Sequence, residues 1–245
     1  MKGSRTLRTL ILGASLWEIA SKIAGGLNFP HSWVVISDFL KLLFTGKFWS
    51  QYFQTLEITF LGLLFGTFLA FLVGVIVSAN RFIGKSFLRF INFFIAIPSV
   101  VFLPIFISSF GANLFTAILI VVLVVFFRMV TFVISGIQNI SSDLVEVAKV
   151  SKLTVIWRAL LIYFPAIFRS LNIGLKYTST IAFGTVIASG IATGTPGIGS
   201  SLLIAESAAD TPRVFSYVLI SGITGLFIYS ISSKLDKLLK HWSYV

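Results

Sequence analysis

Long apolar runs separated by short polar segments dominate the pattern along the chain. A helix needs about 20 predominantly apolar residues to cross the ~30 Å hydrocarbon core of a bilayer. Six segments approach that length: Leu7–Ala24, Phe53–Ala79, Phe87–Ser109, Asn113–Ile137, Ser170–Thr193 and Val214–Ser233. The first is the weakest, because it contains Glu18 and Lys22. The pattern therefore predicts an all-α membrane protein with about six transmembrane helices.

The composition agrees with this pattern. Of the 245 residues, 57% are hydrophobic and only 11% are charged, and the mean hydropathy is +1.00, whereas soluble domains carry about 25% charged residues. The alternation in ~10-residue segments that is typical of an outer-membrane barrel is absent. A net charge of +11 would also suit a nucleic-acid-binding protein. Basic residues of helical membrane proteins normally gather in cytoplasmic loops, however, so we favour the membrane interpretation.

The basic residues predict the orientation. With the N-terminus inside, thirteen of the nineteen Lys and Arg residues fall in cytoplasmic segments. These are Lys2, Arg5, Arg8, Arg81, Lys85, Arg89, Lys149, Lys152, Arg158, Arg169, Lys234, Lys237 and Lys240. Arg128 and Lys176 lie within spans, toward the inner ends, where long side chains reach the interface. Both termini are therefore expected in the cytoplasm.

Two spans contain candidates for a translocation path. Pro98 and Pro104 interrupt the third span, and each is expected to kink or unwind the helix. The fifth span is rich in small and hydroxyl residues, which either pack helices closely or line a polar pore; their density favours the pore. It holds no acidic residue, so an anion would not be repelled there, and Lys176 would attract one. The candidates are Pro98, Ser99, Lys176, Tyr177, Thr178, Thr180, Thr185 and Ser189.

Two segments are expected on the outer side. Leu27–Trp49 has the spacing of an amphipathic helix, which would lie in the membrane interface or form a loop packed on the protein. Gly194–Arg213 is rich in turn formers, and Gly194–Ser201 resembles a P-loop. Ser200 stands where that motif needs a lysine and no strand precedes it, so nucleotide binding is excluded here.

Catalytic and metal-binding chemistry is missing from the sequence. There is no cysteine, and His31 and His241 are far apart, so neither a metal site nor a Ser–His–acid set is expected. Glu18 and Glu57 are the acidic residues in the spans, near the outer interface, where Lys41 or Lys47 could pair with Glu57. An intramembrane enzyme would need clustered polar groups at membrane depth, and a proton-coupled carrier would need a proton relay. We predict a chain with no enzymatic activity, cofactor or metal of its own.

A polar island, Asp143–Pro165, follows the fourth span. It predicts a short helix from Asp143 to Ser151, with Ser142 or Asp143 as N-cap and Glu146 in the first turn. A second short helix follows, with an apolar face that runs from Leu153 to Phe164. Two amphipathic helices on the cytoplasmic side suit either a docking surface for a soluble partner or a loop that lies on the membrane.

The island resembles the signature of the permease subunits of binding-protein-dependent ATP-binding-cassette (ABC) importers. That signature is a cytoplasmic E-A-A, a Gly six residues after the Glu, and an apolar-x-x-Pro ending. Glu146, Val147 and Ala148 match the E-A-A, and Pro165 lies at the family's distance. Lys152 occupies the Gly position, and a left-handed conformation costs a lysine free energy. An altered coupling loop and an atypical subunit are the alternatives, and the consequence of this substitution stays open.

Further short motifs resemble those of the family branch that transports nitrate, aliphatic sulfonates, taurine and bicarbonate. Permeases for thiamine-pyrimidine precursors are related to that branch. In order, the motifs are Leu27–Pro30, Gly46–Trp49, Ala96–Pro98, Leu103–Pro104, Phe110–Gly111, Gly197–Gly199 and Asp210–Phe215. Together they cover roughly Leu27–Lys240.

The resemblance implies a type I importer permease in a bacterial cytoplasmic (inner) membrane. Residues 1–26 would form an N-terminal helix, 27–50 the outer segment, and 51–240 the permease core, with a coupling loop at 139–165. Two permease copies would form the path, two ATPase subunits holding ATP and Mg would bind below, and a substrate-binding protein would dock on Leu27–Trp49 and Gly194–Arg213. The residues that would contact the ATPase are Glu146, Val147, Ala148, Lys149, Lys152, Leu153 and Thr154.

The identity of the solute and the choice between homodimer and heterodimer stay open. A homodimer that imports a small polar or anionic solute is the preferred hypothesis. A permease for a thiamine-pyrimidine precursor or another organic solute, and a stand-alone channel, are the alternatives.

Overall fold

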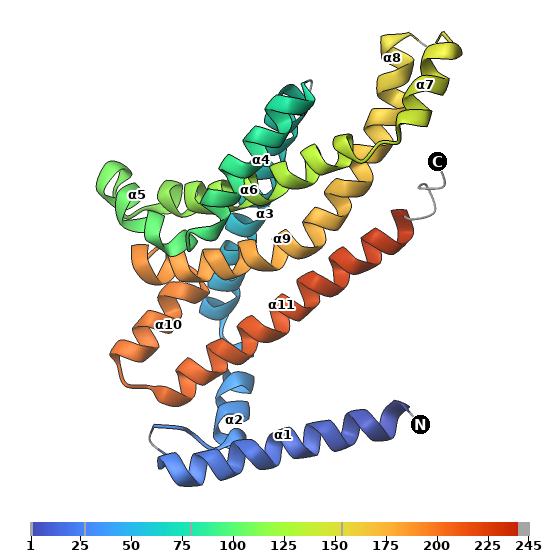
Figure 1. Ribbon diagram of the computed structural model, residues 1–245. Helices are drawn as coiled ribbons and strands as arrows, with labels where there is room; N and C mark the ends of the chain where they lie inside the picture. The colour runs from blue at the N-terminus through green and yellow to red at the C-terminus, as the bar shows by residue number, and fades with distance from the viewer. Residues whose placement is uncertain (1, 27, 79, 153, 240–245) are drawn as a thin grey trace.

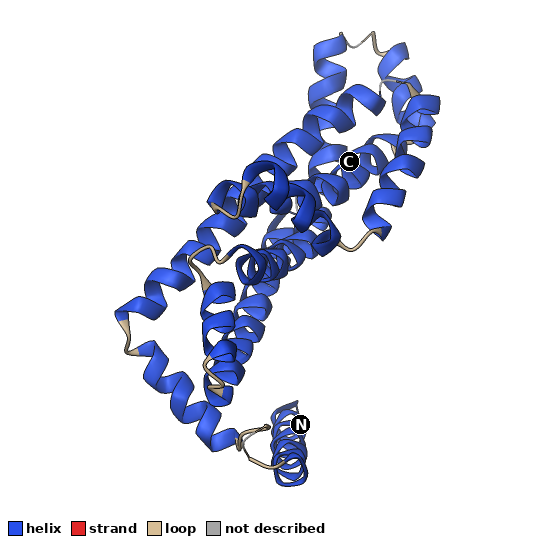
Figure 2. Ribbon diagram, turned by 90° about the vertical axis from the view of Figure 1, so that its left-hand side faces the viewer, coloured by secondary structure: helices blue, strands red, loops and turns tan. Residues whose placement is uncertain are grey.

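The computed structural model describes residues 2–26, 28–78, 80–152 and 154–239, and these form helices without strands (Figures 1 and 2). Leu153, Lys240 and His241 lie outside the described residues. The elements are α1 (Lys2–Ala24), α2 (Ser32–Leu43), α3 (Gly46–Ser78), α4 (Arg81–Ala96), the 3₁₀-helix η1 (Ser99–Phe102), α5 (Leu103–Phe110), α6 (Leu114–Gln138), α7 (Ser142–Val150), α8 (Val155–Arg158), the π-helix η2 (Ala159–Tyr163), α9 (Phe164–Thr193), α10 (Ile198–Ser207) and α11 (Thr211–Leu239).

Three of the described helices, α3, α6 and α11, are by themselves long and apolar enough to cross a membrane. Two bent pairs raise the number to five: α4 with η1 and α5, bent by 86°, and α9 with α10, bent by 48°. The first predicted span is helical over Lys2–Ala24 but does not meet the same test of length and composition. It contains Glu18 and Lys22, which had already marked it as the weakest.

Glycines set the direction in which α3 and α6 pack. Gly62 contacts Val121, Gly66 contacts Val125, and Gly74 contacts Val133, so the residue numbers rise together along both helices. The two helices therefore run parallel. A parallel pair requires the intervening chain to return to its starting side, so the α4–α5 pair crosses the bundle as one broken span.

The remaining spans alternate in direction. Gly136 lies against Ser170, and Phe132 lies against Gly174, so α6 and α9 are antiparallel. Lys176 lies near Tyr229, and Thr180 lies near Gly225, so α9 and α11 are antiparallel as well. It follows that α11 ends on the side from which α7 and α8 project, as Figure 1 also shows.

The predicted third span is broken more sharply than a kink. Pro98 separates α4 from η1, as the missing amide donor led us to expect. Pro104 was expected to distort the helix too, and that was wrong. It lies in the first turn of α5, where a backbone N–H has no intrahelical partner and a proline is tolerated.

The N-terminal helix is fastened to the start of α2 by polar contacts. The Glu18 carboxylate accepts hydrogen bonds from the backbone N–H of Ser32 at 2.9 Å and pairs with Nδ1 of His31 at 2.8 Å. Trp17 donates from Nε1 to the Pro30 carbonyl at 2.9 Å. Glu57, in contrast, is exposed on α3, and neither lysine predicted as its partner lies within ion-pair distance.

Candidate functional site

The predicted coupling segment projects from one end of the bundle as α7 and α8 (Figure 1). The Leu144 N–H donates to Oγ of Ser141 at 3.3 Å, which makes Ser141 the capping side chain. The sequence had pointed to Ser142 or Asp143 instead. Asp143 is the acidic residue of the first turn, and Glu146, which was expected there, begins the second turn.

The outward face of α7 mixes charged and apolar side chains. Glu146 is exposed, and Val147 and Val150 are 61% and 83% exposed, while Ala148 is 2% exposed. Large apolar side chains beside charged ones on a projecting segment are typical of a protein interaction surface. Of the other predicted coupling residues, Lys152 and Thr154 are exposed, Lys149 belongs to α7, and Leu153 lies outside the described residues.

Lys152 forms the left-handed turn that ends α7. Its φ is +52°, and among the described non-glycine residues only Ala209 also has a positive φ. The preceding N–H, of Ser151, donates to the Val147 carbonyl at 2.8 Å and closes the helix. The lysine therefore adopts the conformation that the family's glycine permits, at a cost of about 1–2 kcal/mol, and a left-handed bend is present despite the substitution.

The second predicted helix does not stand alone. α8 continues through η2 into α9 without a turn, so these three elements form one continuous rod, whereas α7 is separated from the rod by the turn at Ser151 and Lys152. Pro165 lies in the first turn of α9 and has no N–H, which removes the donor for the carbonyl four residues before it and accounts for the wider π turn there. Trp157, Leu161 and Phe164 are exposed along this rod.

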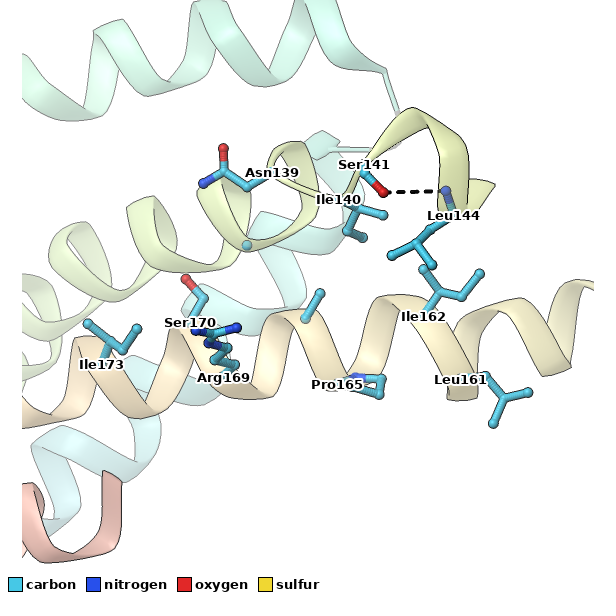
Figure 3. A pocket seen from close by; sticks show the side chains of 12 residues that line it. Asn139, Ile140, Ser141, Leu144, Leu161, Ile162, Pro165, Arg169, Ser170 and Ile173 are labelled. Atoms are coloured by element: carbon cyan, nitrogen blue, oxygen red, sulfur yellow. Dashed lines mark hydrogen bonds between the residues drawn. The ribbon is translucent and has the colours of Figure 1, made fainter. Parts of the chain in front are cut away.

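A pocket of about 420 Å³ lies where α6, α7 and α9 meet. Asn139 and Ser141 line it from the end of α6, and Arg169 and Ser170 line it from α9 (Figure 3). Ser170 donates to the Phe132 carbonyl at 2.5 Å and so joins the two spans at the base of the pocket.

The predicted path residues of α9 fall into two groups. Thr178, Thr185 and Ser189 are buried within the chain. Thr185 donates to the Ile181 carbonyl at 2.9 Å, and Ser189 donates to the Val186 carbonyl at 2.9 Å, so both hydroxyls are satisfied by their own helix. Close packing against the neighbouring helices accounts for this group.

The second group faces open space between α9 and α11. Lys176, Tyr177 and Thr180 line a groove of about 620 Å³. The Lys176 ammonium lies 5.6 Å from the ring centroid of Tyr177 and 5.4 Å from that of Tyr229, within the range of cation–π contacts. The groove holds one positive charge in a mainly apolar and aromatic lining, and the Thr180 hydroxyl is buried without a hydrogen-bond partner among the described residues.

Pro98 and Ser99 line a separate pocket of about 270 Å³ at the break in the third span. Arg128 of α6 and Ile181 of α9 line the same pocket. Sequence reasoning placed Arg128 at the inner end of its span and missed this site. The available signal was that Arg128 is the single charged residue between Ser99 and Ile137.

The two outer segments meet in one surface at the other end of the bundle. The amphipathic helix is confirmed as α2, and it packs on α11 with Val35 buried. Arg213 donates to Asp38 from Nε and Nη2, each at 2.8 Å. A pocket of about 300 Å³ between them is lined by Lys41 and Lys47 from one segment and by Asp210 and Arg213 from the other.

The glycine-rich turn before α10 packs closely against α3 and α9. The Ile198 N–H donates to Oγ1 of Thr55 at 2.9 Å, so it is engaged with α3 and not free for a phosphate. A side chain at Gly199 would collide with the Ile187 carbonyl of α9. These contacts agree with the exclusion of a nucleotide site.

Comparisons with known proteins agree with this arrangement. The family of the binding-protein-dependent transport system inner membrane component matches residues 62–241. The chain is 26% identical to the riboflavin transport system permease protein of Chloroflexus aurantiacus, over 96% of this chain and 88% of that protein. It is 21% identical to a putative aliphatic sulfonates transport permease protein of Bacillus subtilis (93% and 83% covered). It is 23% identical to the nitrate import permease protein of Leptolyngbya laminosa (76% and 66% covered).

Solved structures share the fold. The inward-facing MetNI methionine ABC transporter aligns with a TM-score of 0.66 at 18% identity, over 76% of this chain and 93% of the matched chain. An amino acid ABC transporter aligns with a TM-score of 0.65 at 16% identity, over 81% and 97%. With the family match spanning most of the chain, the protein belongs to the inner membrane permease components of binding-protein-dependent ABC transport systems.

Proposed function

We propose that this chain is the translocation subunit of an ATP-driven importer in the bacterial cytoplasmic membrane. Two copies form the path, and separate ATPase subunits bind the α7–α8 segment. A substrate-binding protein delivers the solute to the surface formed by α2, α10 and the start of α11. ATP and Mg belong to the ATPase subunits, and the chain itself is a non-enzymatic transport subunit.

The observation that carries this proposal is the continuous rod from α8 through η2 into α9. An ATPase that binds the exposed face around Glu146 and Val147 would press on α7, which the turn at Ser151 and Lys152 connects to α8 and so, through η2, to α9. α9 packs along α6 and lines the groove with α11. Binding energy in the partner would thereby shift the spans between two states.

The direction of the helices supports the same orientation. α7 projects from the side on which α11 ends and, in Figure 1, on which α1 begins. The surface of α2 and α10 lies at the opposite end. The sequence places thirteen of nineteen basic residues on the α7 side, so this side is cytoplasmic and both termini are inside.

The solute is a small polar or anionic molecule. Lys176 and Arg128 place positive charge in the groove and in the pocket at the broken span, respectively; Tyr177 also lines the groove, and Ser99 also lines the pocket. A homodimer is the simplest assembly, because a single chain type then supplies both halves of the path.

Glu146→Lys tests the coupling assignment. The variant reverses a charge on the exposed face of α7 and should reduce the amount of ATPase that co-purifies with the chain by at least tenfold, with unchanged membrane insertion. Glu206→Lys on α10 is the matched control, since it makes the same change on an exposed residue at the other end. It should retain the ATPase.

A stand-alone channel makes the opposite prediction. Such a channel would move solute in the purified chain without ATP or an ATPase. If no ATPase co-purifies with the unaltered chain, or if Glu146→Lys leaves association and uptake intact, the proposed coupling is wrong.

A further inference from the structure

Arg128 is a cation with no acidic partner in the described part of the chain. It lies in the third quarter of α6, a helix otherwise free of charged residues. The two ion pairs of the described residues involve Glu18 and Asp38, and neither includes Arg128. A charged side chain within a span is costly, so it normally lies beside an opposite charge or in a polar cavity.

The cavity beside Arg128 is the pocket at the break in the third span. The α4 helix ends at Ala96, and Pro98 has no N–H with which to continue it. The Ile97 N–H donates to the Phe94 carbonyl at 3.2 Å, and the other carbonyl groups of the last turn of α4 lack the donors of a continued helix. In a membrane such groups are tolerated where they line a water-filled cavity, and a pocket of about 270 Å³ is present at this break.

Aromatic and aliphatic side chains line part of the pocket, beside polar groups. Phe94 and Phe127 stack at 5.0 Å between ring centroids on one side, and Leu123 and Ile181 contribute to the rest of the lining. Ser99 and Arg128 supply its polar side chains. Apolar walls lower the local dielectric constant, which strengthens the attraction between a guanidinium and an anion inside.

We infer that Arg128 and Ser99 bind a small oxyanion at the break in the third span, as a site along the translocation path. The inference rests on the proposed function and narrows its solute to an anion. The guanidinium presents a planar fork of N–H donors that matches two oxygens of one anion, and the Ser99 hydroxyl supplies a further donor.

The volume of the pocket limits the class of ligand. About 270 Å³ lies below the roughly 300–1,000 Å³ of pockets for drug-sized ligands. Nitrate or a short sulfonate fits such a space together with water, whereas a multi-ring organic solute does not. The site therefore selects a compact oxyanion.

Chemical protection tests the site directly. The purified chain, in nanodiscs and with whatever ATPase accompanies it, is treated with phenylglyoxal, and modification of individual arginines is measured by mass spectrometry. Sodium nitrate and sodium methanesulfonate should each slow modification of Arg128 at least threefold. Neutral glycerol should not. Arg89, exposed on α4 outside the pocket, is the control within each sample and should react at the same rate throughout.

Variants give a second measurement. Calorimetric titration with nitrate should show affinity reduced at least tenfold in Arg128→Gln and less in Arg128→Lys, which keeps the charge but loses the fork. Arg89→Gln should match the unaltered chain. Equal protection of Arg128 and Arg89, protection by glycerol, or unchanged affinity in Arg128→Gln would overturn the assignment.

Two further measurements separate the anion site from a lipid site and from a failure of the proposed function. In nanodiscs of phosphatidylcholine alone and with added phosphatidylglycerol, protection by nitrate should be the same. Shielding of Arg128 by phosphatidylglycerol without nitrate would mean a lipid site and would refute the path assignment. Co-purification of the ATPase is recorded in the same preparation. If Arg128 is protected but no ATPase co-purifies, the proposed function fails and the anion site stands. If the ATPase co-purifies but Arg128 is not protected, the anion site fails and the proposed function stands.

Discussion

The contact between α3, α6 and α9, called the seam here, differs from the coupling segment 141–154 in how its apolar side chains are covered. In the seam, glycines let backbones approach, and Val121, Val125 and Val133 pack against them with no exposed area. In the coupling segment, Val147 and Val150 are exposed. The first region satisfies its apolar surface within the chain, whereas the second needs a partner to do so.

This difference assigns different roles to the two regions. Interiors at close-packed density transmit displacement without deforming, so the seam moves as a unit. The coupling segment has few internal contacts of its own and is held at its ends, by the α6 junction and by the rod into α9. In the proposed coupling, a force applied to α7 would reach the seam through the turn at Ser151 and Lys152 and then through the rod that ends in α9.

The largest effect is expected from overpacking the seam. A Cβ added at Gly66 would lie 2.6 Å from the Cβ of Val125 and 2.9 Å from the Val122 carbonyl oxygen. Gly66→Leu should destabilise the folded chain by about 3 kcal/mol, the upper part of the usual range for overpacked cores. Thermal unfolding in detergent measures it. Gly13→Ala on α1, where no atom lies within 4 Å, is the control and should not destabilise. Equal stability of the two variants would refute the packing argument.

An intermediate loss of stability is expected at the contact between α2 and α11, whose side chains are partly buried. Asp38→Asn removes the charge that accepts two hydrogen bonds from Arg213. Because both side chains are partly exposed, the loss should be about 1 kcal/mol. Unfolding of Asp38→Asn, Arg213→Gln and the double variant gives the coupling energy. Additive effects would show that the pair contributes no interaction of its own.

The smallest effect is expected in the coupling segment. Lys152→Gly removes the cost of a left-handed lysine but adds backbone freedom, so it should stabilise the turn by about 0.5 kcal/mol. Lys152→Val should do the reverse. Hydrogen exchange of the Ser151 amide, which bonds to the Val147 carbonyl, reports the turn directly. Slower exchange in the valine variant than in the glycine variant would contradict the strained turn.

The sequence predicted the elements better than their contacts. Hydrophobic run length located α3, α6, α9 and α11, and turn chemistry located the break at Pro98. These features depend on local covalent properties, such as the missing amide of proline. The left-handed conformation of Lys152 came only from the structure. Whether Pro104 interrupts a helix or begins one, and which residue caps α7, both depend on where a helix starts to within one residue. Local sequence patterns do not resolve helix boundaries that finely.

The division of the polar residues of α9 required the tertiary structure. Thr178 and Thr180 are both hydroxyl residues two positions apart, yet one is buried and the other lines the groove with α11. Which side of a helix faces a neighbour depends on residues distant in sequence, here on α6 and α11. The same applies to Arg128, which meets Pro98 and Ser99 only through the packing of α6 on the broken span.

The sequence by itself determined the class of the protein and the position of most of its apolar helices, and it supplied the candidate coupling segment, because apolar length, charge placement and the spacing from Glu146 to Pro165 are properties of the chain alone. The tertiary structure decided which polar groups share a cavity. It joined α8 to α9 as one rod and brought α2 and the start of α11 together. It also placed Arg128, which has no acidic partner among the described residues, at a break in a helix. The physical reason is that burial and pairing belong to contacts between distant segments, which no single stretch of sequence contains.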